Sequence, residues 1–286
     1  MSTWNEILEM SKTMPLPDVI LTIEMLEYGT DPQETKEKIG KILKVILEES
    51  KEQFGKKQKT LTGLTGDNAY KFKNYSPKLM GKFNYIATVT ALSISESNAS
   101  MGRIAACPTA GASGIIPGVF YALHLTFKPD FEKLLNAFIV AGGIGNVIAR
   151  KATLSGAAGG CQAEIGSAAA MAAGGLSYFF SEDEKISGNA AALALKSLMG
   201  LVCDPVGGFV EVPCVKRNGN IVNLAISSAE LALSGIKSVI PFDEVVEAMY
   251  KVGKSLPETL RETGEGGIAA TKTAANLLEN IFKKFH

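Results

Sequence analysis

The chain has 286 residues, in which 29 Lys and Arg balance 29 Asp and Glu, with two His and four Cys. Because 46% of the residues are hydrophobic, the chain can bury a sizeable core, which excludes a disordered protein. Zero net charge and the lack of a Lys/Arg-rich stripe remove the field that attracts phosphate, so we expect no nucleic acid partner. Small neutral or zwitterionic ligands suit this charge balance.

The N-terminus does not have the pattern of a secretory signal. Asn5, Glu6 and Glu9 interrupt its apolar residues, whereas a signal needs a basic start and an uninterrupted apolar run. The longest stretch without Asp, Glu, Lys or Arg is 104–127, and Pro, Gly, Ser and Thr crowd its first half. We therefore expect a cytoplasmic protein that does not enter a membrane.

Helix signals dominate along the chain. Asp31 followed by Pro32 predicts a helix start, and apolar residues then recur at three- and four-residue spacing through 39–47. Further helices are predicted from about 115, over the Ala-rich runs 169–180 and 190–199, and over 242–256. Residues 206–215 are compatible with an extended, hairpin-like segment, although the prolines at its ends argue against a central strand. The predicted fold class is all-α.

No Pro/Ser-rich linker divides the chain, so residues 1–286 are predicted to form a single domain. Residues 101–220 hold most of the glycines and few of the charges, which indicates a buried, tightly packed middle. Gly-rich loops there are expected to converge on a site.

Three cysteines, Cys161, Cys203 and Cys214, stand in turn-rich settings with glycine or proline beside them. In a reducing cytosol such cysteines favour metal ligands, catalytic thiols or core residues over disulfides. No Cys-x-x-Cys pair occurs, and His124 and His286 do not complete a zinc-finger spacing, which disfavours structural zinc. Two interpretations stay open, unlinked core thiols and three thiolates that converge on one metal cluster.

Three thiolates would leave one iron of a 4Fe-4S cluster without a protein ligand. Such an iron is a Lewis acid that can polarise a substrate oxygen. An elimination reaction would use it well, because hydroxide is a poor leaving group.

Several loops rich in glycine and hydroxyl groups are candidate carboxylate sites: 97–102, 107–114, 62–67 and 261–267. Backbone N–H groups at a helix N-terminus, with Ser and Thr beside them, can bind an anion. The alternative is that each loop is only a helix-capping turn. The string 142–145 (GGIG) lacks the spacing of a phosphate-binding loop.

A set of longer strings resembles the α chain of iron–sulfur-dependent bacterial L-serine dehydratases, also called L-serine ammonia-lyases. The strings are 98–102 (NASMG), 108–111 (PTAG), 155–164 (SGAAGGCQAE), 200–206 (GLVCDPV), 212–218 (VPCVKRN) and 261–264 (RETG). The resemblance covers about 62–270, and the family order is kept.

The resemblance implies an enzyme that converts L-serine to pyruvate and ammonia with a 4Fe-4S cluster and no pyridoxal phosphate. The family's cluster ligands fall on Cys161, Cys203 and Cys214, and Cys107 has no such role. The family's substrate-contacting loops map onto small and polar residues: Asn98, Ser100, Thr109, Ala110, Gly111 and Ser113 and, outside this stretch, Thr62, Thr65 and Thr263.

The length resembles that of the two-chain form and implies a separate β chain. Some single-chain members end in a cysteine that reaches back to the cluster, whereas this sequence ends at His286, which leaves the resting fourth ligand open. The sequence does not identify the base that removes the substrate proton, and His124 and Lys71 are only guesses. L-cysteine desulfidation, L-threonine deamination and a cluster-bearing sensor subunit are the alternative functions.

Overall fold

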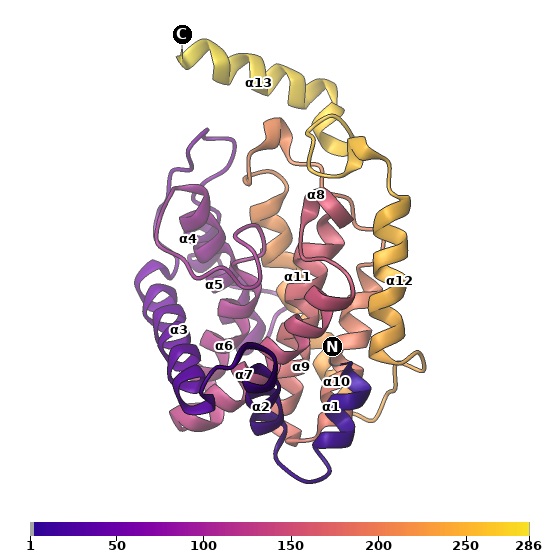
Figure 1. The fold of residues 1–286 in the computed structure, drawn as a ribbon. Helices are drawn as coiled ribbons and strands as arrows, with labels where there is room; N and C mark the ends of the chain where they lie inside the picture. Colours follow the sequence, from indigo (N-terminus) through magenta and orange to yellow (C-terminus); the bar gives the residue numbers. More distant parts are fainter. Residues whose placement is uncertain (1–2, 286) are drawn as a thin grey trace.

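The computed structural model describes residues 3–285, so His286 lies outside it. This part of the chain forms thirteen α-helices, one π-helical turn and three 3-10 turns (Figure 1). Residues 3–285 contain no β-strand, and their only β pairing is two isolated bridges. The predicted all-α fold is confirmed.

The helices follow one another in this order: α1 (Trp4–Met10), α2 (Leu16–Tyr28), α3 (Pro32–Gln53), α4 (Asn68–Lys73), α5 (Lys82–Ala99), α6 (Ile115–Phe127), α7 (Phe131–Lys151), α8 (Gly156–Gly159), α9 (Ser167–Ser181), α10 (Glu184–Ser197), α11 (Cys214–Leu233), α12 (Phe242–Ser255) and α13 (Lys272–Phe285). The π-helical turn, η1 (Gln162–Gly166), runs directly into α9. The 3-10 turns are η2 (Val206–Gly208), η3 (Glu258–Leu260) and η4 (Gly267–Ala270).

The predicted helices are present, and their start signals act as expected. The Asp31 carboxylate accepts a hydrogen bond of 2.8 Å from the Glu34 N–H, and Pro32 occupies the first turn of α3. The predicted Ala-rich helices are α9 and α10, and the predicted helix at 242–256 is α12. Caps and short-range periodicity in the sequence are therefore sufficient to predict these helices.

The Ala-rich helix α9 is the centre of the bundle and packs against α6, α7, α10 and α11. Its side chains are mostly Ala and Gly, so the neighbouring backbones approach closely. A Cβ on Gly175 would lie 2.9 Å from the Ala137 carbonyl oxygen and 3.0 Å from the Ala141 Cβ of α7. Buried residues of the helices from α1 to α12, except α4 and α8, share one hydrophobic core around α9, and Ala69 of α4 belongs to a second, small cluster with Leu92, Ala99 and Val215.

The expectation of an extended segment over 206–215 is wrong. The chain there makes η2, with Gly207 and Gly208 in the left-handed region, and then enters α11 at Cys214. The Val206 N–H donates to the Val212 carbonyl at 2.9 Å, which closes a loop instead of starting a ladder. Val206, Val210 and Val212 are turn residues here, and Val215 lies in the first turn of α11.

One of the described helices, α7, is long and apolar enough to cross a membrane by length and composition alone. Within its apolar window, 67% of the residues are buried inside the protein, as in a core helix of a bundle. The charge-poor stretch noted in the sequence forms a loop and the 13-residue α6.

Three helix starts lie together at one end of the bundle. α6 follows the 107–114 loop, η1 and α9 follow Cys161, and α11 begins at Cys214. α6, α9 and α11 contact one another in pairs, and α8 lies at the same end (Figure 1). The positive ends of these helix dipoles favour anionic groups at this end.

Substitution of Gly175 with Ala tests the close approach of α7 and α9. The added Cβ meets backbone and core atoms that have no room to move, so we expect a loss of about 1–3 kcal/mol in the free energy of unfolding. Denaturant unfolding measures it. Gly142→Ala in α7 is the control, because nothing lies within 4 Å of its Cβ and Ala favours the helix by about 1 kcal/mol. Equal stability of the two variants would contradict the packing.

Candidate functional site

The buried side chain of Gln162 fixes the turn that carries Cys161. Its amide donates to the carbonyl oxygens of Gly159 and Met249 at 2.9 and 3.0 Å, and its oxygen accepts from the Gly200 N–H at 2.9 Å. The Gln162 backbone N–H donates to the Leu201 carbonyl at 3.0 Å. The Cys161 turn is therefore tied to the loop that leads to Cys203.

The segment around Cys203 pairs with the 260–262 segment. The Cys203 N–H donates to the Leu260 carbonyl at 2.9 Å, and the Glu262 N–H donates to the Cys203 carbonyl at 2.7 Å. Glu262 adopts a left-handed backbone with a φ of 69°, which is uncommon for a residue with a side chain. This pairing holds Glu262 beside the cysteine.

A partly buried ion pair joins the Cys203 loop to α11. Arg217 Nη2 lies 2.8 Å from Asp204 Oδ1, and Arg217 Nη1 donates to the Val202 carbonyl at 2.9 Å. The second Asp204 oxygen accepts from the Ile268 N–H at 2.8 Å. Because the pair has further hydrogen bonds on both sides, its desolvation is compensated.

Asn218 of α11 connects the Cys214 helix start to the 109–114 loop. Its side-chain oxygen accepts from the Gly114 N–H at 2.9 Å, and its NH₂ donates to the carbonyl oxygens of Gly111 and Cys214 at 2.8 and 3.0 Å. Because the Asn218 side chain is buried, its hydrogen bonds satisfy backbone N–H and C=O groups of the loop that would otherwise need water as a partner.

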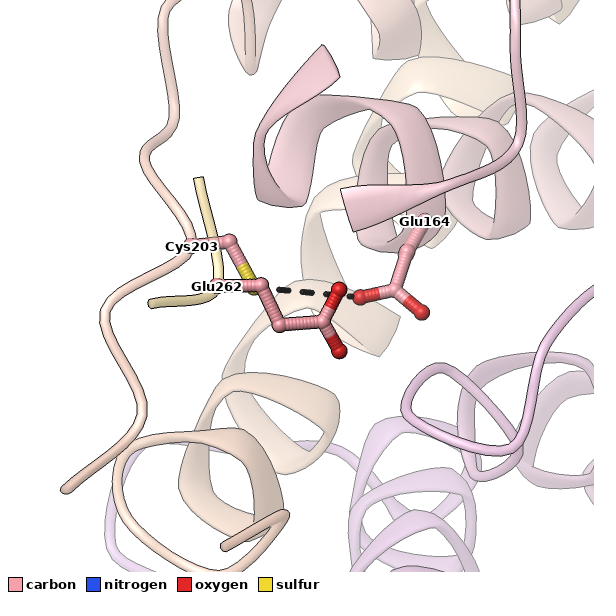
Figure 2. A group of neighbouring side chains, drawn as sticks. All are labelled: Glu164, Cys203 and Glu262. Atoms are coloured by element: carbon pink, nitrogen blue, oxygen red, sulfur yellow. Dashed lines mark hydrogen bonds between the residues drawn. The ribbon is translucent and has the colours of Figure 1, made fainter. Parts of the chain in front are cut away.

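Glu164, Cys203 and Glu262 place one oxygen or sulfur atom each within 4.8 Å of one another. Figure 2 shows the two carboxylates facing each other, with the sulfur of Cys203 4.0 Å from Glu164 Oε2. Gly156 lies against all three groups, since a Cβ there would be 2.7 Å from Glu164 Oε2 and 3.1 Å from the Cys203 sulfur. This group is a compact set of potential ligands.

The predicted cluster cysteines Cys203 and Cys214 each interact with Cys161. A hydrogen bond with the Cys203 thiol and the charge of Arg217 lower the pKa of Cys161 against the opposing effect of burial. The same contact with Cys161, followed by burial, raises the pKa of Cys203. Burial, followed by the charge of Cys161, raises the pKa of Cys214 to about 12. Cys161 therefore lies within electrostatic range of both Cys203 and Cys214, although the three residues come from separate segments.

Two of the predicted substrate residues lie beside the set formed by Glu164, Cys203 and Glu262. A Cβ on Gly111 would be 3.3 Å from Glu164 Oε1. Burial raises the pKa of the Glu164 carboxyl, and the nearby Thr109 hydroxyl opposes this shift only in part. Thr109 Oγ1 is buried and has no partner with hydrogen-bond geometry among the described residues, and the same holds for Ser113 Oγ. Ala110 is exposed between them.

The other predicted substrate residues are held in turns. Ser100 donates to the Lys59 carbonyl, Thr263 donates to the Thr259 carbonyl, and Thr65 accepts from Asn68 and Lys216. The Thr62 N–H donates to Glu211, three residues before Cys214, and Asn98 is half-buried near the end of α5. A substrate contact by these residues stays a prediction.

The two residues suggested as a base, His124 and Lys71, lie outside the set formed by Glu164, Cys203 and Glu262. His124 is exposed on α6, nine residues after the helix start, which corresponds to roughly 13 Å along the axis. Lys71 is exposed on α4 and lines a separate pocket of about 480 Å³. Neither is among the groups that perturb the cysteines.

Glu164, Glu262, Arg217 and Asn218 stand inside the sequence motifs, but no sequence signal marked them as functional residues. The spacing of Glu164 three residues after Cys161 was a usable signal, because such residues share a helix face. Glu262 gave no local signal, since its partner Cys203 lies far away in the sequence.

The model of the family described as "Serine dehydratase alpha chain" matches residues 9–269. This chain belongs to that family. It is 47% identical to a probable L-serine dehydratase α chain of Bacillus subtilis over 77% of this chain and 75% of the relative. It is 38% identical to an L-serine dehydratase α chain of Peptoniphilus asaccharolyticus over 99% of both. An L-serine dehydratase of Helicobacter pylori is 42% identical over 63% of this chain but only 40% of its own length.

Removal of the Asn218 side chain tests its connecting role. Asn218→Ala leaves the Gly114 N–H and the Gly111 carbonyl without partners, so we expect a loss of about 1–3 kcal/mol in the free energy of unfolding for each group that water does not reach. Denaturant unfolding measures the loss. The exposed Asn220→Ala is the control, and an equal effect of the two substitutions would count against the connection.

The thiol of Cys107 is expected to be inert in the folded protein. Burial raises its pKa to about 12, and the thiolate is the reactive form, so alkylation by iodoacetamide at pH 8 should be slow and should speed up as the pH rises. Mass spectrometry of the Cys107 peptide, with and without urea, measures this. Equal labelling of folded and unfolded protein would show that the thiol is accessible.

Proposed function

We propose that this chain is the catalytic α subunit of an L-serine dehydratase, a lyase that converts L-serine to pyruvate and ammonia. The observation that carries the proposal is that Cys203 and Cys214, from two separate segments, both interact electrostatically with Cys161 in a chain of the serine dehydratase α-chain family. Two relatives that this chain matches over 75% and 99% of their length are named as L-serine dehydratase α chains, the first of them as probable.

We further propose that the three thiolates hold a 4Fe-4S cluster. The donor set fits, because Cys161 and Cys214 lie at helix starts, Cys203 lies in a loop beside Cys161, the charge of Arg217 favours the Cys161 thiolate, and the fourth cysteine, Cys107, does not perturb them. When bound, such a cluster supplies an iron with an open position, a Lewis acid toward the leaving hydroxyl. Pyridoxal phosphate is not part of this proposal.

The residues of this chain would bind and orient the amino acid. The loop at 109–114 brings backbone N–H groups and the free Thr109 and Ser113 hydroxyls to the start of α6, where the helix dipole favours a carboxylate. Loss of the Cα proton and of the β-hydroxyl gives 2-aminoacrylate, which tautomerises to the imine. Hydrolysis of the imine releases pyruvate and ammonia.

A separate β chain and a cytoplasmic location complete the proposal. Two of the relatives are named as α chains, and this chain matches 40% of the longer Helicobacter pylori dehydratase, which leaves room for a function carried by another chain here. Neither nucleic acid nor a membrane is proposed as a partner.

Replacement of the cysteines one at a time tests the ligand set. Cys161→Ala, Cys203→Ala and Cys214→Ala should each lose iron, sulfide and pyruvate formation, because a cluster that is short of one thiolate is not held. Cys107→Ala is the matched control and should keep them. Anaerobic iron and sulfide analysis, followed by the pyruvate assay with a β chain, measures both.

An intact cluster in Cys203→Ala would remove that residue from the ligand set. Full cluster content without turnover, even with the β chain present, would favour a sensor subunit instead. Release of pyruvate from L-serine, 2-oxobutyrate from L-threonine, or sulfide from L-cysteine identifies the preferred substrate.

A further inference from the structure

A cavity lies between α2, α3, α7 and the end of α9. Its volume is about 480 Å³, which is the size of a small-molecule site. α9 starts just after the Cys161 turn and reaches the cavity at Tyr178 and Phe179, after most of its 15 residues, which span roughly 22 Å. The cavity is therefore remote from the cysteines, and the proposed reaction makes no use of it.

The wall of the cavity carries more negative than positive charge. Two of its acidic residues have a lysine beside them, in the pairs Lys36–Glu132 and Lys133–Glu182. The other two, Asp18 and Asp130, form no ion pair with any side chain in the part of the chain that the structure describes. They stand at the starts of α2 and α7, but Asp130 makes no cap hydrogen bond, and a helix end offsets only about half a charge. A bound cation would balance the rest.

Tyr178 gives an independent indication of a ligand. Only 7% of this residue is exposed, it lines the cavity, and its hydroxyl forms no hydrogen bond within residues 3–285. Burial, followed by the charges of Glu182, Glu184 and Asp18, raises the pKa of Tyr178 to about 12. Because Glu182 and Asp18 belong to the cavity wall, the hydroxyl that they perturb faces the same space. A polar group this deeply buried needs a partner, and a molecule in the cavity would supply one.

The spacing of the carboxylates favours an organic cation over a metal ion. Within the described residues, three His, Cys, Asp or Glu side chains bring ligand atoms within 4.8 Å of one another only at Glu164, Cys203 and Glu262. Three carboxylates of the cavity therefore do not surround one ion. Pro17 and Phe179 add apolar surface for a carbon chain, and the Lys133 ammonium lies 5.0 Å from the Phe179 ring centre.

We propose that this cavity binds an aliphatic diamine, with one ammonium group at Asp18, the other at Asp130 and the carbon chain against Phe179. Two ammonium groups match the two unpaired carboxylates in charge, and each has N–H donors to spare for the oxygen of Tyr178. The inference is independent of the proposed function, because none of these residues belongs to the cysteine end of the bundle.

Calorimetric titration of the purified chain with 1,4-diaminobutane and with butylamine tests the site. The diamine should bind once per chain and at least about 10-fold more tightly than butylamine, which leaves one carboxylate unpaired. Asp18→Asn and Asp130→Asn should each weaken diamine binding about 10-fold, and Tyr178→Phe about 2- to 10-fold, because each removes one partner. Glu279→Gln, which changes an exposed carboxylate on α13, is the matched control and should bind as the wild type does.

Thermal unfolding without ligand identifies any variant that is not folded, and Tyr178→Phe keeps the ring and its packing. A Kd for the diamine above about 10 mM, or equal affinity in the wild type and all three variants, overturns the inference. Binding of Mg²⁺ in place of the diamine, lost in Asp18→Asn and Asp130→Asn, would show a metal site and overturns it as well. Pyruvate formation from L-serine tests the proposed function separately, and the three variants should keep it.

Discussion

The site depends on buried polar side chains that hydrogen-bond to the backbone of loops. Loops at the end of a helix bundle have N–H and C=O groups with no partner in a helix, and each buried one needs a hydrogen bond. Gln162 serves the 159–162 and 200–201 segments, and Asn218 serves 111–114 and 214. Asp204 and Arg217 do the same for 202–204 and 268. Four side chains thus determine where the cysteines lie.

Electrostatics then favours negative charge at this end of the bundle. The starts of α6, η1 with α9, and α11 contribute positive helix ends, and Arg217 adds a full charge that lowers the pKa of Cys161. Burial opposes this effect, because it raises the pKa of Cys214 to about 12 and, after the hydrogen bond with Cys161, also raises that of Cys203. The zero net charge of the chain conceals this polarised site.

The sequence predicts the parts of this protein whose causes are local. The cap at Asp31 and the Ala-rich composition of α9 act within one or two turns, and their helices were correctly placed. The extended conformation considered for 206–215 is not formed. The conformation of this segment is determined by a loop closure and by the start of α11, which are both tertiary effects. Spacing alone left the cysteines undecided between core thiols and ligands, and only the resemblance to a family indicated a shared site. Glu262 was missed for the same reason, since nothing local indicates that it reaches Cys203.

The glycine at 156 illustrates how the fold leaves room for chemistry. Its backbone does not require glycine for a left-handed angle, because its φ lies outside that region. The restriction is spatial, since a Cβ would press on the Glu164 and Glu262 carboxylates and on the Cys203 sulfur. Carboxylates at the ends of flexible side chains can move away, so a methyl group here would displace the ligand groups before it disturbed the bundle. The small residue therefore preserves the geometry of the site more than the stability of the fold.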